Sequence, residues 1–300
     1  MRLSLEDLER KAEEAEEVLS SCTICPRSCR VNRLKGEKGF CRGGHLAKVA
    51  SHNSHFGEEP PISGRRGSGT IFFSGCTLCC VFCQNYPISQ LCEGREVSNL
   101  ELARMMLSLQ KRGCHNINLV TPTHFVPQFL KGLFLAKKEG FDLPLVYNTS
   151  GYETIRTLKI LDGVVDVYLP DLKYGDDEAG VEVSGVKDYF TLAAPALKEM
   201  YRQTGNLVRN DEGAAVKGLI VRHLVLPENL STTDKVLRFL AEEISPEVTV
   251  SLMAQYFPAH KALTHPALRR RVTLEEYSRM VKLAQDLGLH NVFIQENLEY

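Results

Sequence analysis

Short apolar runs alternate with longer amphipathic segments along most of the chain. The runs are rich in β-branched residues, which is typical of buried strands, and the segments between them repeat apolar positions with a helical period. The six predicted strands are Thr70–Phe73, Ile117–Val120, Leu143–Tyr147, Val165–Leu169, Leu219–Val225 and Val248–Leu252. The predicted helices span about residues 99–112, 126–139, 152–161, 186–203, 232–243 and 273–287.

This alternation predicts an α/β fold, a parallel sheet with crossover helices. Six units are too few for a full eight-stranded barrel, but they suit an open doubly wound sheet or a partial barrel. In both architectures ligands bind at the carboxyl ends of the strands. The unusual residues follow the predicted strands: a cysteine cluster first, and then Thr121–His124, Asn148–Gly151, Pro170–Lys173, Arg222–Glu228 and Met253–Pro258.

Residues 1–67 differ in composition from the rest of the chain. They contain a charged amphipathic helix pattern, a cysteine-rich knuckle and a lead-in rich in Gly, Pro and Ser. We therefore predict an N-terminal appendage over residues 1–67 and a single barrel domain over residues 68–300.

Composition narrows the classes of partner. The 300 residues are 43% hydrophobic, enough to bury a large core, and the formal net charge of −1 gives no attraction to nucleic acid or an anionic membrane. No segment approaches the roughly 20 apolar residues of a membrane span, and the N-terminus lacks the apolar core of a signal peptide. We expect a cytoplasmic protein, in which ten cysteines indicate metal or redox chemistry rather than disulfides.

Four cysteines lie close together after the first predicted strand. Cys76, Cys80 and Cys83 have the spacing C-x3-C-x2-C, and three thiolates on one loop can hold three corners of a [4Fe–4S] cluster. The fourth iron would then be open to a small molecule. Cys79 is the odd member, although a pair of Cys76 and Cys79 is also possible. The alternative is a structural zinc loop that takes its fourth ligand from another cysteine or a histidine.

A second group of cysteines lies in the N-terminal knuckle. Cys22, Cys25, Cys29 and Cys41 have the spacing C-x2-C-x3-C-x11-C and predict a second metal site. Zinc suits a closed four-thiolate site and would staple the appendage to the barrel. An iron–sulfur cluster also fits and would offer an electron route to the first site. We favour zinc or another structural metal.

The first cysteine motif, with aromatic Phe82 before its last cysteine, resembles the radical S-adenosylmethionine signature. The words "HFGEEPPISG", "SGCTLCCVFCQNYPIS", "NINLVTPTHFVPQ", "YNTSGYE" and "VYLPDLKY" resemble the PflX group of pyruvate formate-lyase-activating-enzyme-like iron–sulfur proteins. The similarity runs from about Cys22 to Gln295. It implies a partial (β/α)6 TIM-like barrel, the radical S-adenosylmethionine core, with a [4Fe–4S] cluster at its top and the Cys-rich appendage before it.

The resemblance also implies a cofactor and a reaction. The open iron would bind the amino and carboxylate groups of S-adenosylmethionine, and a reduced cluster would pass one electron to the sulfonium. Cleavage of the S–C5′ bond would give a 5′-deoxyadenosyl radical, which abstracts a hydrogen atom from the substrate. Phe82 would belong to this cofactor site.

The strand-two motif departs from the resembled family. Family members commonly place a GGE-like motif there to meet the methionine amino group, whereas this chain has Thr121-Pro122-Thr123-His124. The hydroxyls of Thr121 and Thr123, a carbonyl group or His124 are candidates for that role. The alternative is a turn at Pro122 with Thr123 as the cap of the next helix.

Other candidate residues follow strands three to five. Asn148 and Ser150 resemble the polar motif that approaches the ribose or the methionyl carboxylate. Asp171 and Lys173 match a D-L-K motif in which the lysine approaches that carboxylate, the alternative being a surface ion pair. Arg222 and His223 alternate on strand five, so only one of them can face the barrel interior.

The sequence leaves three hypotheses for function. The resemblance favours hydrogen abstraction from a backbone glycine of a partner glycyl-radical enzyme, with an electron donor such as flavodoxin or ferredoxin. A second hypothesis is the radical modification of a small molecule or peptide. A third is a non-enzymatic electron-transfer or zinc-stapled scaffold protein, which would not bind S-adenosylmethionine.

Overall fold

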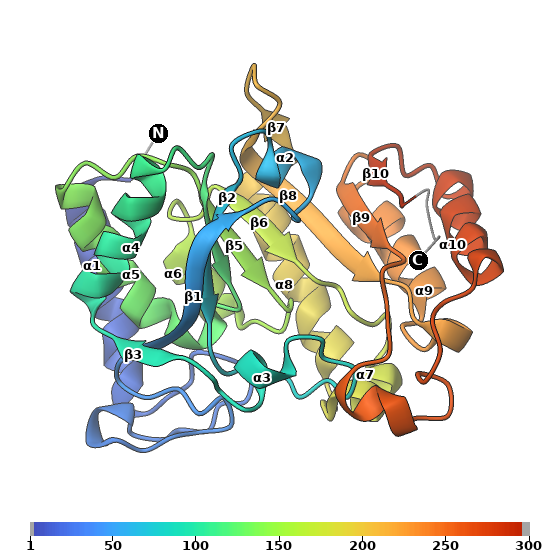
Figure 1. Ribbon diagram of the computed structural model, residues 1–300, viewed down its shortest axis with the longest axis horizontal. Helices are drawn as coiled ribbons and strands as arrows, with labels where there is room; N and C mark the ends of the chain where they lie inside the picture. The colour runs from blue at the N-terminus through green and yellow to red at the C-terminus, as the bar shows by residue number, and fades with distance from the viewer. Residues whose placement is uncertain (1–2, 296–300) are drawn as a thin grey trace.

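The computed structural model describes residues 3–295, whose strands join one extended sheet (Figure 1). In chain order they are β1 (Ala47–His55), β2 (Ser68–Phe73), β3 (Arg95–Val97), β4 (Ile117–Val120), β5 (Leu145–Thr149), β6 (Val167–Pro170), β7 (Val208–Arg209), β8 (Ala215–Leu224), β9 (Thr249–Met253) and β10 (Val292–Phe293). Over the described residues the sheet is ten-stranded, in the order β10-β9-β8-β6-β5-β4-β2-β1-β3, with β7 paired to β8. All pairs from β2 to β10 along this order are parallel. The predicted partial barrel and its six strands are confirmed.

Helices cover the outer side of the parallel strands (Figure 1). In chain order the helices of the described residues are α1 (Leu5–Glu17), α2 (Pro60–Ser63), α3 (Tyr86–Ser89), α4 (Asn99–Lys111), α5 (Val126–Lys138), α6 (Ile155–Leu161), α7 (Asp177–Ser184), α8 (Tyr189–Thr204), α9 (Thr233–Phe239) and α10 (Leu274–Asp286), of which the short α2, α3 and α7 lie at the ends of the sheet (Figure 1). The six predicted helices are present as α4, α5, α6, α8, α10 and α9, the last extended by a π-helical turn at Leu240–Ile244.

Two of these helices begin later than predicted. The Thr154 side chain accepts a hydrogen bond from the Thr157 amide at 3.1 Å and caps α6, which therefore starts at Ile155 rather than at residue 152. Residues assigned to a loop form the short α7, which ends at left-handed Gly185 (φ 62°), so α8 begins at Tyr189 and not at 186. A helix as short as α7 carries too few apolar repeats to stand out in the sequence.

Strand β5 lies two residues later than predicted. Pro144 has no amide hydrogen to give to a ladder, although its carbonyl accepts from the Ile117 amide at 2.9 Å. The strand therefore starts at Leu145 and includes Asn148 and Thr149. Asn148 is therefore the next-to-last residue of β5 and does not belong to the loop after it. The strand fixes the direction of its side chain.

Strand β1 was not predicted. It runs antiparallel to β2, and β3 pairs with its other side, so residues of the predicted appendage extend the sheet. Only Ala47 and Val49 of this strand are buried, and the remaining positions are polar or half-exposed, which explains the weak sequence signal. The domain boundary near Gly67 stays a prediction.

The predicted N-terminal helix is confirmed as α1. Its apolar face, with Leu8, Ala12 and Ala15 buried, lies against α5 (Figure 1, left). None of the helices formed by residues 3–295 has the length and apolar character that crossing a bilayer requires.

Helix α4 offers a matched test of the core. Leu102 is fully buried beside Gly132 of α5, whereas Leu100 on the same helix is 49% exposed. We predict that Leu102→Ala lowers the free energy of unfolding by about 2–5 kcal/mol because it leaves a cavity. Leu100→Ala should change it by less than about 0.5 kcal/mol. Urea titration followed by circular dichroism measures both, and equal effects would contradict this packing.

Candidate cofactor site at the carboxyl end of the sheet

The cysteine cluster follows β2 directly. The turn that leads into it requires Gly75, whose φ is 87° and where an added Cβ would lie 2.3 Å from the carbonyl oxygen of Cys41. A side chain at this position would therefore push the N-terminal knuckle away from the loop. The Ser74 carbonyl accepts a hydrogen bond from the His124 ring at 2.9 Å, which fixes the start of the loop against the end of β4.

Each of the three predicted ligands has a polar neighbour at its sulfur. The Leu78 amide donates to Cys76 Sγ at 3.4 Å, and the Ser184 hydroxyl donates to Cys80 Sγ at 2.8 Å. Cys83 Sγ lies 3.2 Å from the Ser89 hydroxyl. Hydrogen bonds of this kind tune iron–sulfur clusters.

Cys79 differs from these three cysteines. Its side chain is exposed, and its thiol donates to Gln90 Oε1 at 3.7 Å. The contacts favour Cys76, Cys80 and Cys83 as the ligand set, with Cys79 outside it, and this assignment stays a prediction.

The donor set fits a thiophilic metal group. Burial, followed by the neighbouring Cys80 thiol, raises the pKa of Cys76 to about 12, and burial also raises the pKa of Cys80. Thiolates in such a place need a compensating metal charge. Within residues 3–295, no three Cys, His, Asp or Glu side chains yet converge as they would around one bound ion. A cubane cluster holds its cysteines at separate corners, so it does not require that convergence.

Asp171 and Lys173 lie in a half-buried charged network at the same edge. Lys173 Nζ is 2.7 Å from one oxygen of Asp171, and Arg222 Nε is 2.8 Å from the other. Arg222 also donates to Asn148 Oδ1 at 2.6 Å and approaches Glu58 at 3.5 Å. The network joins β5, β6, β8 and the loop after β1. The sequence alternative of a surface ion pair does not describe it, because both side chains are only about one-fifth exposed.

Pairing decides the charge state of this network. Burial opposes ionisation of Asp171, but Arg222 and Lys173 outweigh it and lower the pKa of the carboxyl. Burial likewise disfavours the charged lysine, yet Asp171 and then Cys80 raise the pKa of Lys173. Lys173 is therefore a cation close to a predicted cluster ligand.

Arg222 and His223 point to opposite sides of β8, as the strand period requires. Arg222 faces the network, whereas His223 is fully buried between the Leu172 carbonyl at 2.6 Å and the Thr233 hydroxyl at 2.8 Å. Burial lowers the pKa of His223 to about 4, so it is a neutral structural residue at pH 7.

The strand-two turn is tied into the protein interior. Thr121 is half-buried with a left-handed φ of 57°, and its amide donates to the Asn148 carbonyl at 2.8 Å. The Thr123 hydroxyl is buried and donates to Glu153 at 2.5 Å. His124 is fully buried, and burial lowers its pKa to about 4. The engaged Thr123 and His124 therefore leave Thr121 as the more accessible of the candidates proposed at this turn.

Two other predicted cofactor residues are also partly engaged. The Ser150 carbonyl accepts from the Tyr189 hydroxyl at 2.8 Å, which holds the loop after β5. Phe82 is buried edge-on against Tyr256, with ring centroids 6.1 Å apart. The roles of Ser150 and Phe82 toward a cofactor stay predictions.

Several residues of the site were not predicted. Glu58, beside Arg222, was visible only as one of two consecutive acids in the lead-in. Ser184 comes from the unpredicted α7, and nothing in its local sequence marks a contact with Cys80. Glu153 closes the word "YNTSGYE", where an acid in the loop after a predicted strand was the available signal.

Glu153 lies in a cage of hydroxyl groups. One carboxyl oxygen accepts from Thr123 and Thr149 at 2.5 Å each and from Tyr147 at 3.2 Å, whereas the other is buried and has no hydrogen-bond partner among the described residues. Burial raises the pKa of Glu153 to about 7, partly offset by these hydrogen bonds.

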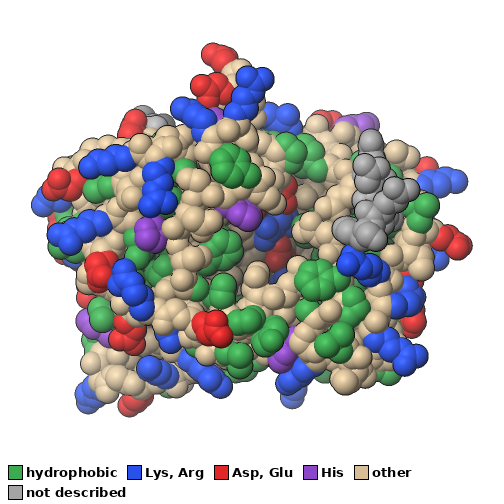
Figure 2. All heavy atoms as spheres, in the orientation of Figure 1, with side chains coloured by type: hydrophobic (Ala, Val, Ile, Leu, Met, Phe, Trp, Pro, Cys, Tyr) green, Lys and Arg blue, Asp and Glu red, His purple; other side chains and the backbone are tan. Residues whose placement is uncertain are grey.

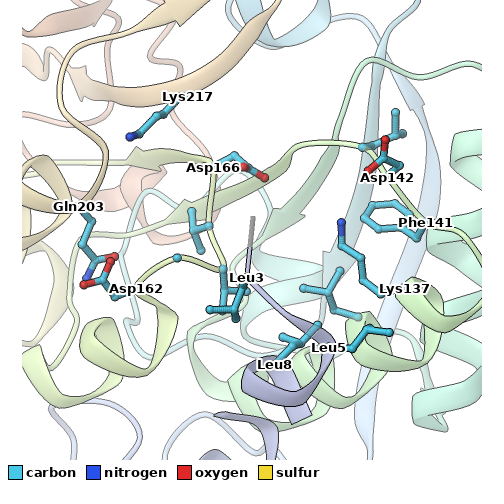
Figure 3. A pocket seen from close by; sticks show the side chains of 15 residues that line it. Leu3, Leu5, Leu8, Lys137, Phe141, Asp142, Asp162, Asp166, Gln203 and Lys217 are labelled. Atoms are coloured by element: carbon cyan, nitrogen blue, oxygen red, sulfur yellow. The ribbon is translucent and has the colours of Figure 1, made fainter. Parts of the chain in front are cut away.

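Two hollows of the surface bear on the location of the site. Figure 2 shows basic and acidic side chains recessed at the centre of one face. A separate cavity of about 410 Å³ lies near the amino ends of β5 and β6, lined among others by Leu3, Phe141 and Lys217 (Figure 3). Parallel sheets bind their ligands at the opposite edge, so we place the candidate site at the cysteine loop and not in this cavity.

The pKa of Glu153 predicts a pH effect on stability. Between about pH 4.5 and 7 the unfolded chain ionises this group while the folded chain keeps the proton, so stability contributed by Glu153 is lost as the pH rises. The loss should reach roughly 3 kcal/mol, at about 1.4 kcal/mol per pKa unit. Glu153→Gln should therefore gain stability relative to wild type from pH 5 to pH 8, measured by urea unfolding.

Glu276→Gln is the control for this experiment. Hydrogen bonding to Arg270 lowers the pKa of Glu276, so its contribution is lost only as the pH falls below about 4.5. The control difference should stay constant from pH 5 to pH 8. A constant difference for Glu153→Gln as well would contradict the raised pKa.

Comparisons with known proteins agree with this location. The model of the Radical SAM superfamily matches residues 70–240. An uncharacterized protein of Methanocaldococcus jannaschii, MJ0674, is 33% identical over 95% of this chain and 80% of its own length. A second uncharacterized protein of that organism, MJ0808, is 22% identical over 91% of this chain and 80% of its own length.

Solved structures are similar at a lower level. Native anSMEcpe with bound AdoMet has a TM-score of 0.49 and 12% identity, covering 71% of this chain and 57% of that chain. HydG, a maturase of the [FeFe]-hydrogenase, has a TM-score of 0.49 and 13% identity, covering 96% and 62%. This chain spans less than two thirds of either protein, and we draw no argument on chemistry from them.

The family match covers more than half of the chain, including the whole cysteine loop and the strands that carry the charged network. The M. jannaschii relative extends the similarity over nearly the full length. The chain therefore belongs to the radical SAM superfamily, whose cofactors are a [4Fe–4S] cluster and S-adenosylmethionine.

Proposed function

We propose that this protein is a radical SAM enzyme that abstracts a hydrogen atom from a backbone glycine of a partner protein. The observation that carries the cofactor half of this proposal is the charged network at the carboxyl end of the sheet, in which Lys173 Nζ and Arg222 Nε lie 2.7 and 2.8 Å from the two oxygens of Asp171. When bound, the cluster and S-adenosylmethionine supply one-electron cleavage of the sulfonium and the radical chemistry that follows.

The network has charges suited to an amino acid group. Lys173 and Arg222 are cations that can pair with a carboxylate, and Asp171 is an anion that can pair with an ammonium. The hydrogen-bonded Asn148 amide adds a neutral polar group. We propose that these residues hold the methionyl end of the cofactor against the cysteine loop, while Thr121 and Ser150 lie at the neighbouring loops.

A loop after β9 limits access to the cysteine loop. The Ala262 amide donates to the Val81 carbonyl at 3.0 Å, and Tyr256 packs edge-on against Phe82 while its hydroxyl donates to the Leu268 carbonyl at 2.6 Å. These contacts shield the cluster ligands from solvent on this side, which a reactive radical requires.

The substrate half of the proposal rests on the resemblance to activating enzymes through the D-L-K and "YNTSGYE" motifs. A glycyl-radical protein would be the hydrogen donor, and flavodoxin or ferredoxin the electron donor. The second candidate, modification of a small molecule or peptide, is favoured by the strand-two turn, because Thr123 and His124 are engaged inside the protein and depart from the activase pattern.

Cofactor chemistry can be tested with matched cysteine variants. In anaerobically reconstituted protein with dithionite and S-adenosylmethionine, we predict an electron paramagnetic resonance signal that shifts on adding S-adenosylmethionine, and formation of 5′-deoxyadenosine. Cys80→Ala should abolish both, whereas Cys79→Ala should retain both because that thiol points elsewhere. Asp171→Asn should weaken S-adenosylmethionine binding by about tenfold or more, through loss of a charged partner. A reconstituted protein without cluster signal or deoxyadenosine would favour the scaffold hypothesis instead.

The hydrogen donor can be identified by isotope transfer. We predict that host proteins labelled with α-deuterated glycine pass deuterium into 5′-deoxyadenosine, as measured by mass spectrometry, with unlabelled protein as control. Transfer from the labelled small-molecule fraction alone would contradict the glycine proposal and favour the second candidate.

A further inference from the structure

The N-terminal knuckle, residues 22–41, has little regular structure, although three of its four cysteines are buried. Residues 18–46 contain two three-residue 3-10 turns and, within this described stretch, no α-helix or strand. Even so, Cys22, Cys25 and Cys41 are 3%, 4% and 7% exposed. An irregular segment of this length in a compact protein needs another source of order.

The backbone curves around the four cysteines. Ser28 and Arg30 take left-handed φ angles of 43° and 55°, and the Arg30 amide donates to the Cys22 carbonyl at 2.9 Å. Non-glycine residues in this region cost energy and persist only where the surroundings hold them. Cys29, the exposed member, is held against Gly39, where an added Cβ would lie 2.3 Å from its sulfur.

The sulfurs receive amide donors as Cys76 does in the cluster loop. The Gly43 amide lies 3.4 Å from Cys41 Sγ, and the Arg27 amide forms the equivalent bond to Cys25. In each case the donor is two residues after the cysteine, the relation of Leu78 to Cys76. Amide donors at sulfur stabilise thiolate over thiol.

A buried cation faces these thiols. Arg33 is 1% exposed and places Nη1 4.0 Å from Cys22 Sγ. Its other hydrogen bonds go to neutral carbonyls, at 2.6 and 2.8 Å to Gly44 and at 2.7 Å to His124. A buried charge is costly unless an opposite charge compensates it. Four thiolates around a divalent ion, or around an iron–sulfur cluster, carry the net negative charge that would do so.

We propose that Cys22, Cys25, Cys29 and Cys41 bind a second thiophilic metal centre, a zinc ion or an iron–sulfur cluster, which braces the radical SAM cysteine loop and takes Arg33 as its counter-charge. Within residues 3–295 the thiols do not converge on one point, so loading requires them to move toward the metal.

The bracing follows from three contacts between knuckle and loop. Arg27 Nε donates to the Thr77 carbonyl at 2.9 Å, between Cys76 and Cys80. The Cys41 carbonyl sits against Gly75. Arg33 donates a hydrogen bond to the His124 carbonyl, and the His124 ring donates one to the Ser74 carbonyl. These contacts connect the knuckle to residues 74–77, so a metal that orders the knuckle would also restrict the motion of those residues.

The test separates the two metal sites. A full-length chain with Cys76, Cys80 and Cys83 all replaced by alanine is loaded either with zinc sulfate or, anaerobically, with iron and sulfide, and its metal is measured by mass spectrometry. We expect about one zinc ion per chain, or about four irons with sulfide, and the better-retained metal identifies the centre. Because this variant cannot use the first site, the result does not depend on whether the protein cleaves S-adenosylmethionine.

Further variants assign the ligands. Adding Cys25→Ser and Cys41→Ser should remove the metal, and adding Cys92→Ser and Cys114→Ser instead should not. Arg33→Met deletes no ligand and should lower metal affinity at least tenfold in a chelator competition, which keeps the test valid if the double serine variant unfolds. No bound metal under either loading condition, or metal retained without Cys25 and Cys41, would overturn the proposed site.

Bracing has its own readout. In the same triple-alanine chain, chelation should speed hydrogen exchange of the amides of residues 74–83, while those of α10, remote from the knuckle, stay unchanged. Equal exchange in residues 74–83 with and without metal would overturn the bracing role.

Discussion

The carboxylate of Asp171 holds the carboxyl edge of the sheet together electrostatically. It lies between Lys173 and Arg222, and Arg222 extends the connection to Asn148 and Glu58. Charges that are mostly shielded from water stabilise one another as a set, because removing one partner leaves the others uncompensated. Bonds to Asp171 and Arg222 therefore join three strands and the loop after β1, and removal of the Asp171 carboxylate would leave Lys173 and Arg222 without the acid that each contacts most closely.

A second constraint is the close approach of the knuckle to the cysteine loop. Gly75 lets the Cys41 carbonyl come nearer than any side chain would permit, and His124 fills the space on the other side. His124 stays neutral at pH 7 because burial lowers its pKa. Its ring therefore supplies a hydrogen bond to the loop without adding a charge near the predicted cluster ligands. The loop is thus placed by the close approach at Gly75 together with the side chains of Arg27, His124 and Ser184.

The sequence predicted what local pattern and spacing can encode. Apolar periodicity located the parallel strands and their helices. Cysteine spacing pointed to two groups of cysteine residues, and the D-L-K motif pointed to the charged pair of Asp171 and Lys173. Sequence patterns did not reveal β1, in which only Ala47 and Val49 are buried. They also did not reveal the short α7, which brings Ser184 to Cys80. The partners of Arg222 and Glu153 were also out of reach, because each is chosen by residues distant in the chain that meet only after folding.

The knuckle is synthesised before the residues that pack against it in the folded protein. Cys22 to Cys41 leave the ribosome before Gly75 and His124, the residues that help enclose them. At elongation rates on the order of 5–20 residues per second, the stretch up to His124 takes on the order of ten seconds to make. During that interval the thiols of the nascent chain are accessible to oxidants and to free metal ions, before Gly75 and His124 pack against the knuckle.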